Sequence, residues 1–220
     1  MKQAPAAKQL ASFLAKFSPE VAAVARQAIT LLRRQLPAAL VHRLSGPAAG
    51  PWMVPSAVRW LGRELQPSWA VLELGSGSST AWLARRVSRV ISFEDDRAWY
   101  RQVRRDLGED GLRNSEVRFC PIDDLPGVLA SFESESIDVA IVDCNESEEV
   151  DRIDCLVAVR DLVRPGGLLI LDDSDRIGYE SQGQHLQGWE ARRFIGLKPY
   201  PLMAVETAVY RRPGSADLAG

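Results

Sequence analysis

A glycine-rich stretch at residues 73–80 has the composition of a ligand-binding turn. Two glycines, Gly75 and Gly77, follow the apolar run 70–74 and precede a hydroxyl-rich segment, 78–80. Because glycine lacks a Cβ atom, the main chain can approach a ligand closely there or adopt a positive φ angle. In open α/β sheets, ligands bind beyond the carboxyl ends of the strands, where this turn would lie. Taken alone, the pattern also fits a tight strand-to-helix turn that binds nothing.

An acidic cluster at the end of the next apolar run adds a second ligand signal. Glu94 closes the run 89–93, nineteen residues after Gly75, and is followed by Asp95 and Asp96. A carboxylate at this position of a βαβ unit can accept hydrogen bonds from the two hydroxyls of a ribose. A solvated acidic strand end is the simpler alternative. The turn and the acid together favour a ligand that contains a nucleoside.

The residues around the turn favour a cationic ligand over a dinucleotide. A dinucleotide-binding turn has a third glycine where this chain has Thr80. The hydroxyls of Ser79 and Thr80 can satisfy the helix amino-terminal donors that a pyrophosphate would need. Glu73 places a carboxylate near the turn, which repels phosphate and attracts an ammonium or sulfonium group. We therefore expect S-adenosylmethionine rather than NAD.

The elements needed to position these residues alternate along the chain. Apolar runs predict strands at 70–74, 89–93, 117–120, 137–142, 168–171 and 206–210. Amphipathic spacing predicts helices between them, at 79–87, 97–107, 125–130 and 148–162. Strands that alternate with helices form βαβ units, so the predicted fold is α/β, with a doubly wound and mainly parallel sheet.

Three segments are predicted along the chain. Residues 1–67 carry apolar residues at helical spacing and no strand pattern, so we expect a helical N-terminal cap. Residues 68–212 form the predicted ligand-binding core, and residues 213–220 a flexible tail.

Composition and charge limit the classes of function. The chain has 220 residues, of which 46% are hydrophobic and 25% charged, as in ordinary globular proteins. Residues 1–66 carry nine Lys or Arg against two Asp or Glu, whereas the remainder carries 18 against 27, so the body is acidic. An acidic body disfavours nucleic acid as a partner. The sequence has no long apolar run, no signal-like leader and no CxxC pair among its three cysteines, so we expect a cytoplasmic protein without a membrane span.

Motifs occur in order along residues 68–212: the turn 73–80, the acid Glu94, and the segments Cys120–Asp124, Ile137–Asp143 and Leu162–Asp173. In this order they resemble the class I S-adenosylmethionine-dependent methyltransferase superfamily. The stretch that follows the fifth strand is most similar to an O-methyltransferase-like bacterial group. The resemblance implies a seven-stranded sheet whose last strand runs antiparallel, built from around residues 194–197 and 206–210.

The residue patterns and the resemblance together imply roles for individual side chains. Cofactor contacts are expected from Glu73, Gly75, Ser76, Gly77, Ser79, Thr80, Glu94, Asp95, Asp123 and Asp143. The candidates for a catalytic base are Asp143, Asp172, Asp173 and His185. Asp143, Asp172 and Asp173 also resemble the Mg²⁺ ligands of cation-dependent O-methyltransferases. The favoured alternative needs no metal: Asp173 to Asp175 cap a helix, and Asp175 pairs with Arg176.

The predicted function is methyl transfer to an oxygen of a small-molecule acceptor. Two alternatives stay open, a NAD-dependent oxidoreductase and a non-catalytic nucleoside-binding module. A nucleic-acid methyltransferase is disfavoured, because no Asn/Asp-Pro-Pro-Tyr motif follows the fourth strand. Trp52 is a candidate wall for the acceptor, Trp99 is predicted to lie in the core, and a homodimer is left open.

Overall fold

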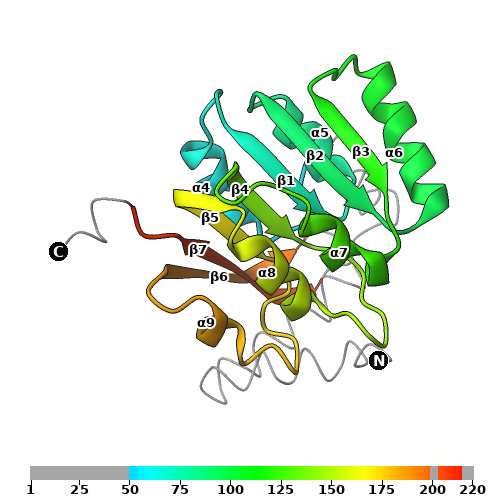
Figure 1. The fold of residues 1–220 in the computed structure, drawn as a ribbon. Helices are drawn as coiled ribbons and strands as arrows, with labels where there is room; N and C mark the ends of the chain where they lie inside the picture. Colours follow the sequence, from blue (N-terminus) through cyan, green and yellow to red (C-terminus); the bar gives the residue numbers. More distant parts are fainter. Residues whose placement is uncertain (1–49, 199–202, 215–220) are drawn as a thin grey trace, which may run out of the picture.

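The computed structural model describes residues 50–198 and 203–214 (Figure 1). Its strands are β1 (Ala70–Leu74), β2 (Arg89–Glu94), β3 (Ser115–Phe119), β4 (Ile137–Val142), β5 (Val163–Leu171), β6 (Glu190–Lys198) and β7 (Met203–Arg211). Its helices are α4 (Pro55–Glu64), α5 (Ser78–Ala84), α6 (Arg97–Glu109), α7 (Leu125–Leu129), α8 (Arg152–Arg160) and α9 (Gln182–His185), with a 3₁₀ turn, η2 (Ile122–Asp124).

The seven strands form one sheet in the order β3-β2-β1-β4-β5-β7-β6. The strands β1 to β5 pair in parallel, whereas β7 runs antiparallel to both β5 and β6. The carboxyl ends of β1, β2, β4 and β5 therefore meet at one edge, and β6 ends at the same edge. The predicted α/β class and the antiparallel last strand are both confirmed.

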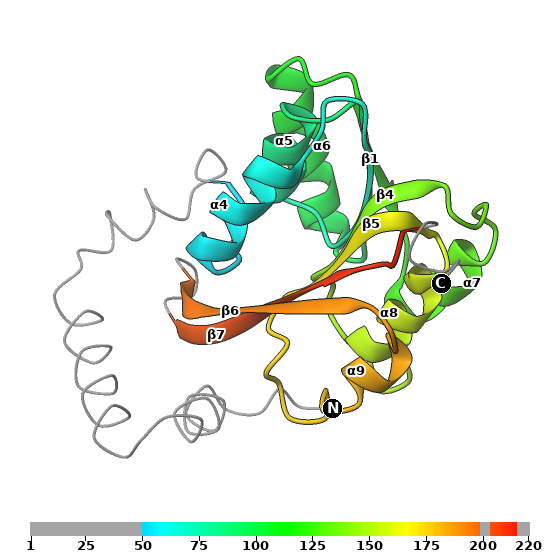
Figure 2. The ribbon, with the colours of Figure 1, turned by 90° about the vertical axis from the view of Figure 1, so that its left-hand side faces the viewer.

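Helices cover both faces of the sheet (Figure 2). Neighbouring residues of β1 show why: Val71 packs in a core with Leu61 and Leu83, on the face of α4 and α5. Leu72 points the other way, into a core with Leu156 of α8. A strand that is buried on both sides must be apolar at successive positions, which is the run pattern of the sequence.

Several element boundaries differ from the predicted ones, and three of the differences have a clear cause. α8 begins at Arg152 rather than near residue 148, because Asp151 caps it and accepts hydrogen bonds from the amides of Ile153 (2.7 Å) and Asp154 (3.0 Å). β5 begins five residues before the predicted position 168, and β6 extends beyond the predicted 194–197 at both ends. Pairing with β4 and β7 extends these strands through residues whose own patterns are weak.

Most of the predicted N-terminal cap and the last six residues of the chain lie outside the described residues. The described part of the cap includes α4, which packs Ala57 against Val205 of β7 and Leu61 against β1 and its neighbours. In the described residues, every helix is too short or too polar to cross a bilayer.

Candidate active site

A cavity of about 500 Å³ opens at the carboxyl edge of the sheet. Loops that follow β1, β2 and β4 form one side of it, and side chains from the regions of β5, α8, β6 and β7 form the other. Six of the predicted cofactor or catalytic residues line it, Gly75, Ser76, Glu94, Asp95, Asp143 and Asp173, and so does Trp52, the predicted acceptor wall. The topology thus brings together residues that are up to 98 positions apart in the sequence (173 minus 75).

The first glycine of the turn is held between two strand ends. Gly75 has a φ of +98°, and its amide donates to the carbonyl of Phe93 at 2.9 Å. A Cβ atom added at this position would lie 2.7 Å from the carbonyl oxygen of Asp143. Both the dihedral angle and the close approach therefore require glycine here, whatever the turn binds.

Glu94 faces the turn from the end of β2. Its Oε2 accepts hydrogen bonds from the Ser76 amide (3.1 Å) and hydroxyl (2.7 Å), and its Oε1 accepts one from the Asp96 amide (3.0 Å). The residue is only 5% exposed, and burial raises the pKa of its carboxyl. The carboxylate nevertheless borders the cavity, where its remaining lone pairs can accept from a ligand.

Two predicted cofactor contacts lie behind the turn instead of in the cavity. Thr80 is fully buried and donates to Glu73 at 2.6 Å, while its hydroxyl oxygen accepts from the Gly77 amide at 3.0 Å. Ser92 donates to the same carboxylate at 2.7 Å, and burial raises the pKa of Glu73 to about 7. Glu73 and Thr80 therefore stabilise the turn through buried hydrogen bonds and do not line the cavity.

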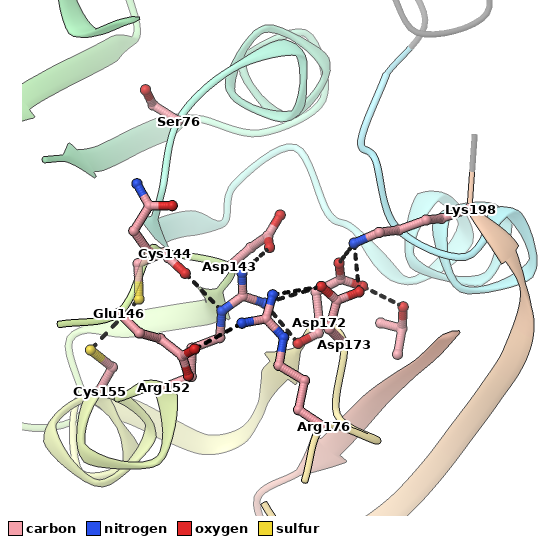
Figure 3. A network of polar contacts seen from close by, with 12 residues as sticks. Ser76, Asp143, Cys144, Glu146, Arg152, Cys155, Asp172, Asp173, Arg176 and Lys198 are labelled. Carbon is pink, nitrogen blue, oxygen red and sulfur yellow. Dashed lines mark hydrogen bonds and ion pairs between the residues drawn. The ribbon is translucent and has the colours of Figure 1, made fainter. Parts of the chain in front are cut away.

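Arg152, at the start of α8, connects the ends of β4 and β5 (Figure 3). Its guanidinium donates to the carbonyls of Cys144 (2.7 Å) and Asp172 (2.9 Å) and pairs with Asp143 at 2.9 Å. Burial by itself disfavours the charge of Arg152, but Asp143 and Asp173 outweigh it and hold the pKa above its usual range. The arginine thus fixes the carboxylate of Asp143 beside the turn.

Asp172 and Asp173 are paired with cations. Lys198 Nζ lies 2.5 Å from Asp173 Oδ1 and 3.2 Å from Asp172 Oδ2, and Arg176 contacts Asp173 Oδ2 at 2.8 Å. Burial would raise the pKa of Asp173, but Lys198, Arg152 and Arg176 together hold it below its usual range. Asp172 has no exposed surface, accepts from Thr207 at 2.7 Å, and has its pKa raised by burial to about 7.

Residues 72–174 match a protein-family model described as a methyltransferase domain. The match begins in β1 and ends just after β5, so it contains the glycine turn, Glu94 and Asp143. This match identifies residues 72–174 as a methyltransferase domain, which is consistent with the class I S-adenosylmethionine-dependent methyltransferase superfamily.

Solved methyltransferase structures share this fold at low sequence identity. The O-methyltransferase TomG from Streptomyces achromogenes is 20% identical with a TM-score of 0.56, over 72% of this chain and 78% of TomG. A methyltransferase from Geobacter sulfurreducens is 22% identical with a TM-score of 0.54, over 85% and 96% of the two chains. An rRNA methylase from Streptococcus thermophilus is 17% identical with a TM-score of 0.54, over 72% and 95%. No curated protein matches the chain.

The other predicted site residues of this methyltransferase have different surroundings. Gly77 and Ser79 line a small space of about 40 Å³ beside the main cavity, together with Trp52, Trp99 and Asp143. Asp95, in the main cavity, accepts from the Asn145 side chain at 2.9 Å. Asp123 is exposed and accepts a hydrogen bond from the Ser147 hydroxyl. Neither Asp123 nor His185, on α9, lines the cavity.

The predicted role of the Asp173–Asp175 segment as a helix cap is wrong. Asp175 accepts from the Glu206 amide at 3.0 Å, and Arg176 pairs with Asp173 and Glu146. In the part of the methyltransferase that the structure describes, no group of three His, Cys, Asp or Glu is placed to hold a metal ion. Arginine and lysine side chains occupy the space between the three aspartates.

Four residues of the site were missed or misassigned from the sequence. Trp99 was predicted in the core, but it lines the cavity and donates from Nε1 to the Ser76 carbonyl at 2.8 Å. Arg152 and Lys198 were not singled out at all, and Arg176 was named only as a partner of Asp175. Arg176 follows the recognised acidic stretch, whereas nothing in the sequence near Lys198 predicts that its side chain reaches the end of β5.

Proposed function

We propose that this methyltransferase transfers the methyl group of S-adenosylmethionine to an oxygen of a small-molecule acceptor. The observation that carries the proposal is a single cavity that joins the glycine turn, the Glu94 carboxylate and Asp143. We call the turn and Glu94 the donor side of this cavity, and Asp173, Arg176 and Lys198 its acceptor side.

The donor side has groups suited to both ends of the methyl donor. The free lone pairs of Glu94 can accept from the ribose hydroxyls, and the main chain at Gly75 and Ser76 leaves room for the methionine portion. Four carboxylates border this part of the cavity, those of Glu94, Asp95, Asp96 and Asp143. Their negative charge favours a ligand with an ammonium and a sulfonium group.

The same features disfavour a dinucleotide. A pyrophosphate needs free amides at the amino terminus of α5, but the Gly77 amide already donates to Thr80 at 3.0 Å. The carboxylates of the donor side would also repel two phosphates. These contacts support methyl transfer over the oxidoreductase alternative.

Asp143 is the best-placed proton acceptor among the four candidates. Its side chain is 36% exposed and borders the cavity, whereas Asp172 is fully buried and His185 lies elsewhere. Asp173 borders the cavity too, but its three cationic neighbours stabilise the carboxylate and make it a weak base. A base of this kind adds about 10²–10⁴-fold to a rate that otherwise rests on holding two reactants in line.

The choice of acceptor rests on charge more than on fold. TomG is an O-methyltransferase involved in tomaymycin synthesis, and the Streptococcus protein is an rRNA methylase, although both have this fold. In this chain residues 67–220 carry 18 basic and 27 acidic side chains. Such a body would repel a nucleic-acid backbone, which supports a small acceptor.

Calorimetric titration with S-adenosylmethionine, S-adenosylhomocysteine and NAD tests the donor. We expect binding of the two sulfur ligands and none of NAD, and native mass spectrometry of fresh protein is expected to detect a co-purified adenosyl ligand. NAD binding without binding of either sulfur compound would overturn the proposal. Incubation with methyl-labelled donor and separate pools of small hydroxyl compounds and of RNA then tests the acceptor, with label expected only in the former.

A further inference from the structure

Lys198 is a buried cation that faces the acceptor side of the cavity. It is the last residue of β6, and its side chain reaches from the sheet margin toward the end of β5 (Figure 3). The side chain is 8% exposed and forms part of the cavity lining. The backbone of Lys198 lies four strands from β1, or roughly 19 Å at the usual strand spacing, but its ammonium reaches the end of β5, two strands from β1.

The hydrogen bonds of Lys198 leave one donor unused among the described residues. A lysine ammonium has three N–H donors. One reaches Asp173 Oδ1 at 2.5 Å and a second reaches Asp172 Oδ2 at 3.2 Å. The two carboxylates fix the direction of the ammonium, so that the third donor is available to an oxygen in the cavity.

The ammonium is also held in its charged form. Burial opposes the charge of Lys198, but Asp172, Asp173 and Asp143 outweigh it and raise the pKa of the lysine. A charged ammonium cannot remove a proton, but it can stabilise negative charge that develops on a nearby oxygen.

We propose that the third donor of Lys198 binds the reacting oxygen of the acceptor and stabilises it as an oxyanion, which makes phenols and enols the acceptor class. This inference rests on the proposed function, since it concerns the acceptor of the same transfer. The acceptor O–H bond breaks, and its proton passes to the Asp143 carboxylate and then to solvent. A lone pair of the oxyanion forms the O–CH₃ bond as the S–CH₃ bond breaks, and the bonding pair stays on sulfur in S-adenosylhomocysteine.

The test compares methyl transfer to a panel of phenols (phenol, catechol and 3,4-dihydroxybenzoate) by the native protein and three variants. Lys198→Met is expected to lower kcat by about 10²–10³-fold, as when one oxyanion donor is removed. Lys198→Arg keeps a charged donor and is expected to recover part of the rate. Arg192→Met removes a cation from the exposed part of the same strand and is expected to change nothing.

Two further measurements separate a catalytic role from a structural one. Removal of the ammonium is expected to shift the rising limb of the pH–rate profile to higher pH, which a loss of packing alone would not do. Binding of S-adenosylhomocysteine is expected to stay unchanged in Lys198→Met, because the lysine faces the acceptor. A tenfold or greater loss of affinity for S-adenosylhomocysteine would mean that Lys198 binds the carboxylate of the methyl donor, and this would overturn the inference.

The outcomes distinguish this inference from the proposed function. If the native protein binds no S-adenosylmethionine, the proposed function fails. If it binds the donor but methylates no phenol of the panel, or if Lys198→Met transfers methyl groups at the native rate, the inference on Lys198 fails alone. Should Lys198→Met fail to fold, the double variant Asp172→Asn/Lys198→Met removes the uncompensated buried charge and is measured in its place, with the same expected loss of rate.

Discussion

The donor and acceptor sides of the cavity are built in opposite ways. On the donor side, the contacts come from the main chain of a short turn and from one carboxylate nineteen residues later. On the acceptor side, carboxylates from the end of β5 are neutralised by cations from the loop after β5 and from β6, with Arg152 of α8 joining the two sides. The donor side thus depends on local geometry, and the acceptor side on charge balance among distant elements.

This difference explains how one fold serves many acceptors. A turn whose glycine is required by contact with the neighbouring strand cannot vary without loss of the site. A network of ion pairs can change its shape when one strand-end residue changes, while the sheet beneath it stays the same. The acceptor side is therefore where substrate preference can diverge.

The largest effect that would test this contrast is expected from Arg152→Met. It removes a buried charge and leaves Asp143 and Asp173 without their shared partner, which costs about 3–5 kcal/mol of unfolding free energy. Urea unfolding measures the loss. Arg160→Met, on the more exposed end of the same helix, is the control and is expected to stay within about 0.5 kcal/mol of the native protein. A native-like Arg152→Met would mean that charge balance does not hold the acceptor side together.

Gly75→Ala is the corresponding change on the donor side. The added Cβ meets the Asp143 carbonyl at 2.7 Å in a backbone with φ of +98°, so we expect a loss of about 2–4 kcal/mol in stability, together with loss of donor binding. Gly127→Ala in α7 has open space around its Cβ and is expected to be neutral or slightly stabilising. The melting temperatures of both variants measure the change in stability, and calorimetric titration measures donor binding. Retained donor binding in Gly75→Ala would contradict a turn fixed by local geometry.

Glu94→Gln tests the charge on the donor side, because it keeps the shape of the side chain and removes its negative charge. We expect donor affinity to weaken by about 1.5–3 kcal/mol, since hydrogen bonds from the ribose to a charged acceptor are lost. Glu116→Gln, at the exposed residue of β3, provides the control. Equal affinities of the two variants for S-adenosylhomocysteine would reject the ribose role.

The last prediction concerns the support beneath the turn, and its effect is measured as a slope of stability with pH, the smallest change at any single pH step. The pKa of Glu73 is raised from 4.5 to about 7, so the folded protein holds a proton that the unfolded chain releases. Its contribution to stability is full below pH 4.5 and is lost as the pH rises toward 7, at up to about 1.4 kcal/mol per pH unit. Glu73→Gln is expected to flatten the fall in unfolding free energy between about pH 5 and about pH 7, where the native slope includes this group. An unchanged slope would show that Glu73 is ionised in the folded protein.

Much of the fold and of the donor side could be predicted because the signals are local. The strand at 70–74, the turn and the acid at 94 lie within one βαβ unit, whose geometry is nearly constant. Predictions failed where a side chain's partner is distant. Trp99 has the spacing of a core residue, but it contacts the turn through Ser76. Asp175 was expected to pair with its neighbour Arg176, but it accepts a hydrogen bond from the distant Glu206 amide on β7, and Arg176 pairs with Asp173 and Glu146.

The sequence by itself determined the α/β sheet and the glycine turn with Glu94 near it, because apolar periodicity and glycine spacing act over a few residues. The antiparallel last strand was implied by the resemblance to a known family. Only the tertiary structure decided the surroundings of each carboxylate. Asp143, Asp172 and Asp173 are alike in the sequence, yet Asp143 borders the cavity and pairs with Arg152, Asp172 is buried against Thr207, and Asp173 borders the cavity and is held by three cations. Their states depend on Arg152 and Lys198, which come from other elements, and electrostatic energy depends on distance in space rather than on separation along the chain.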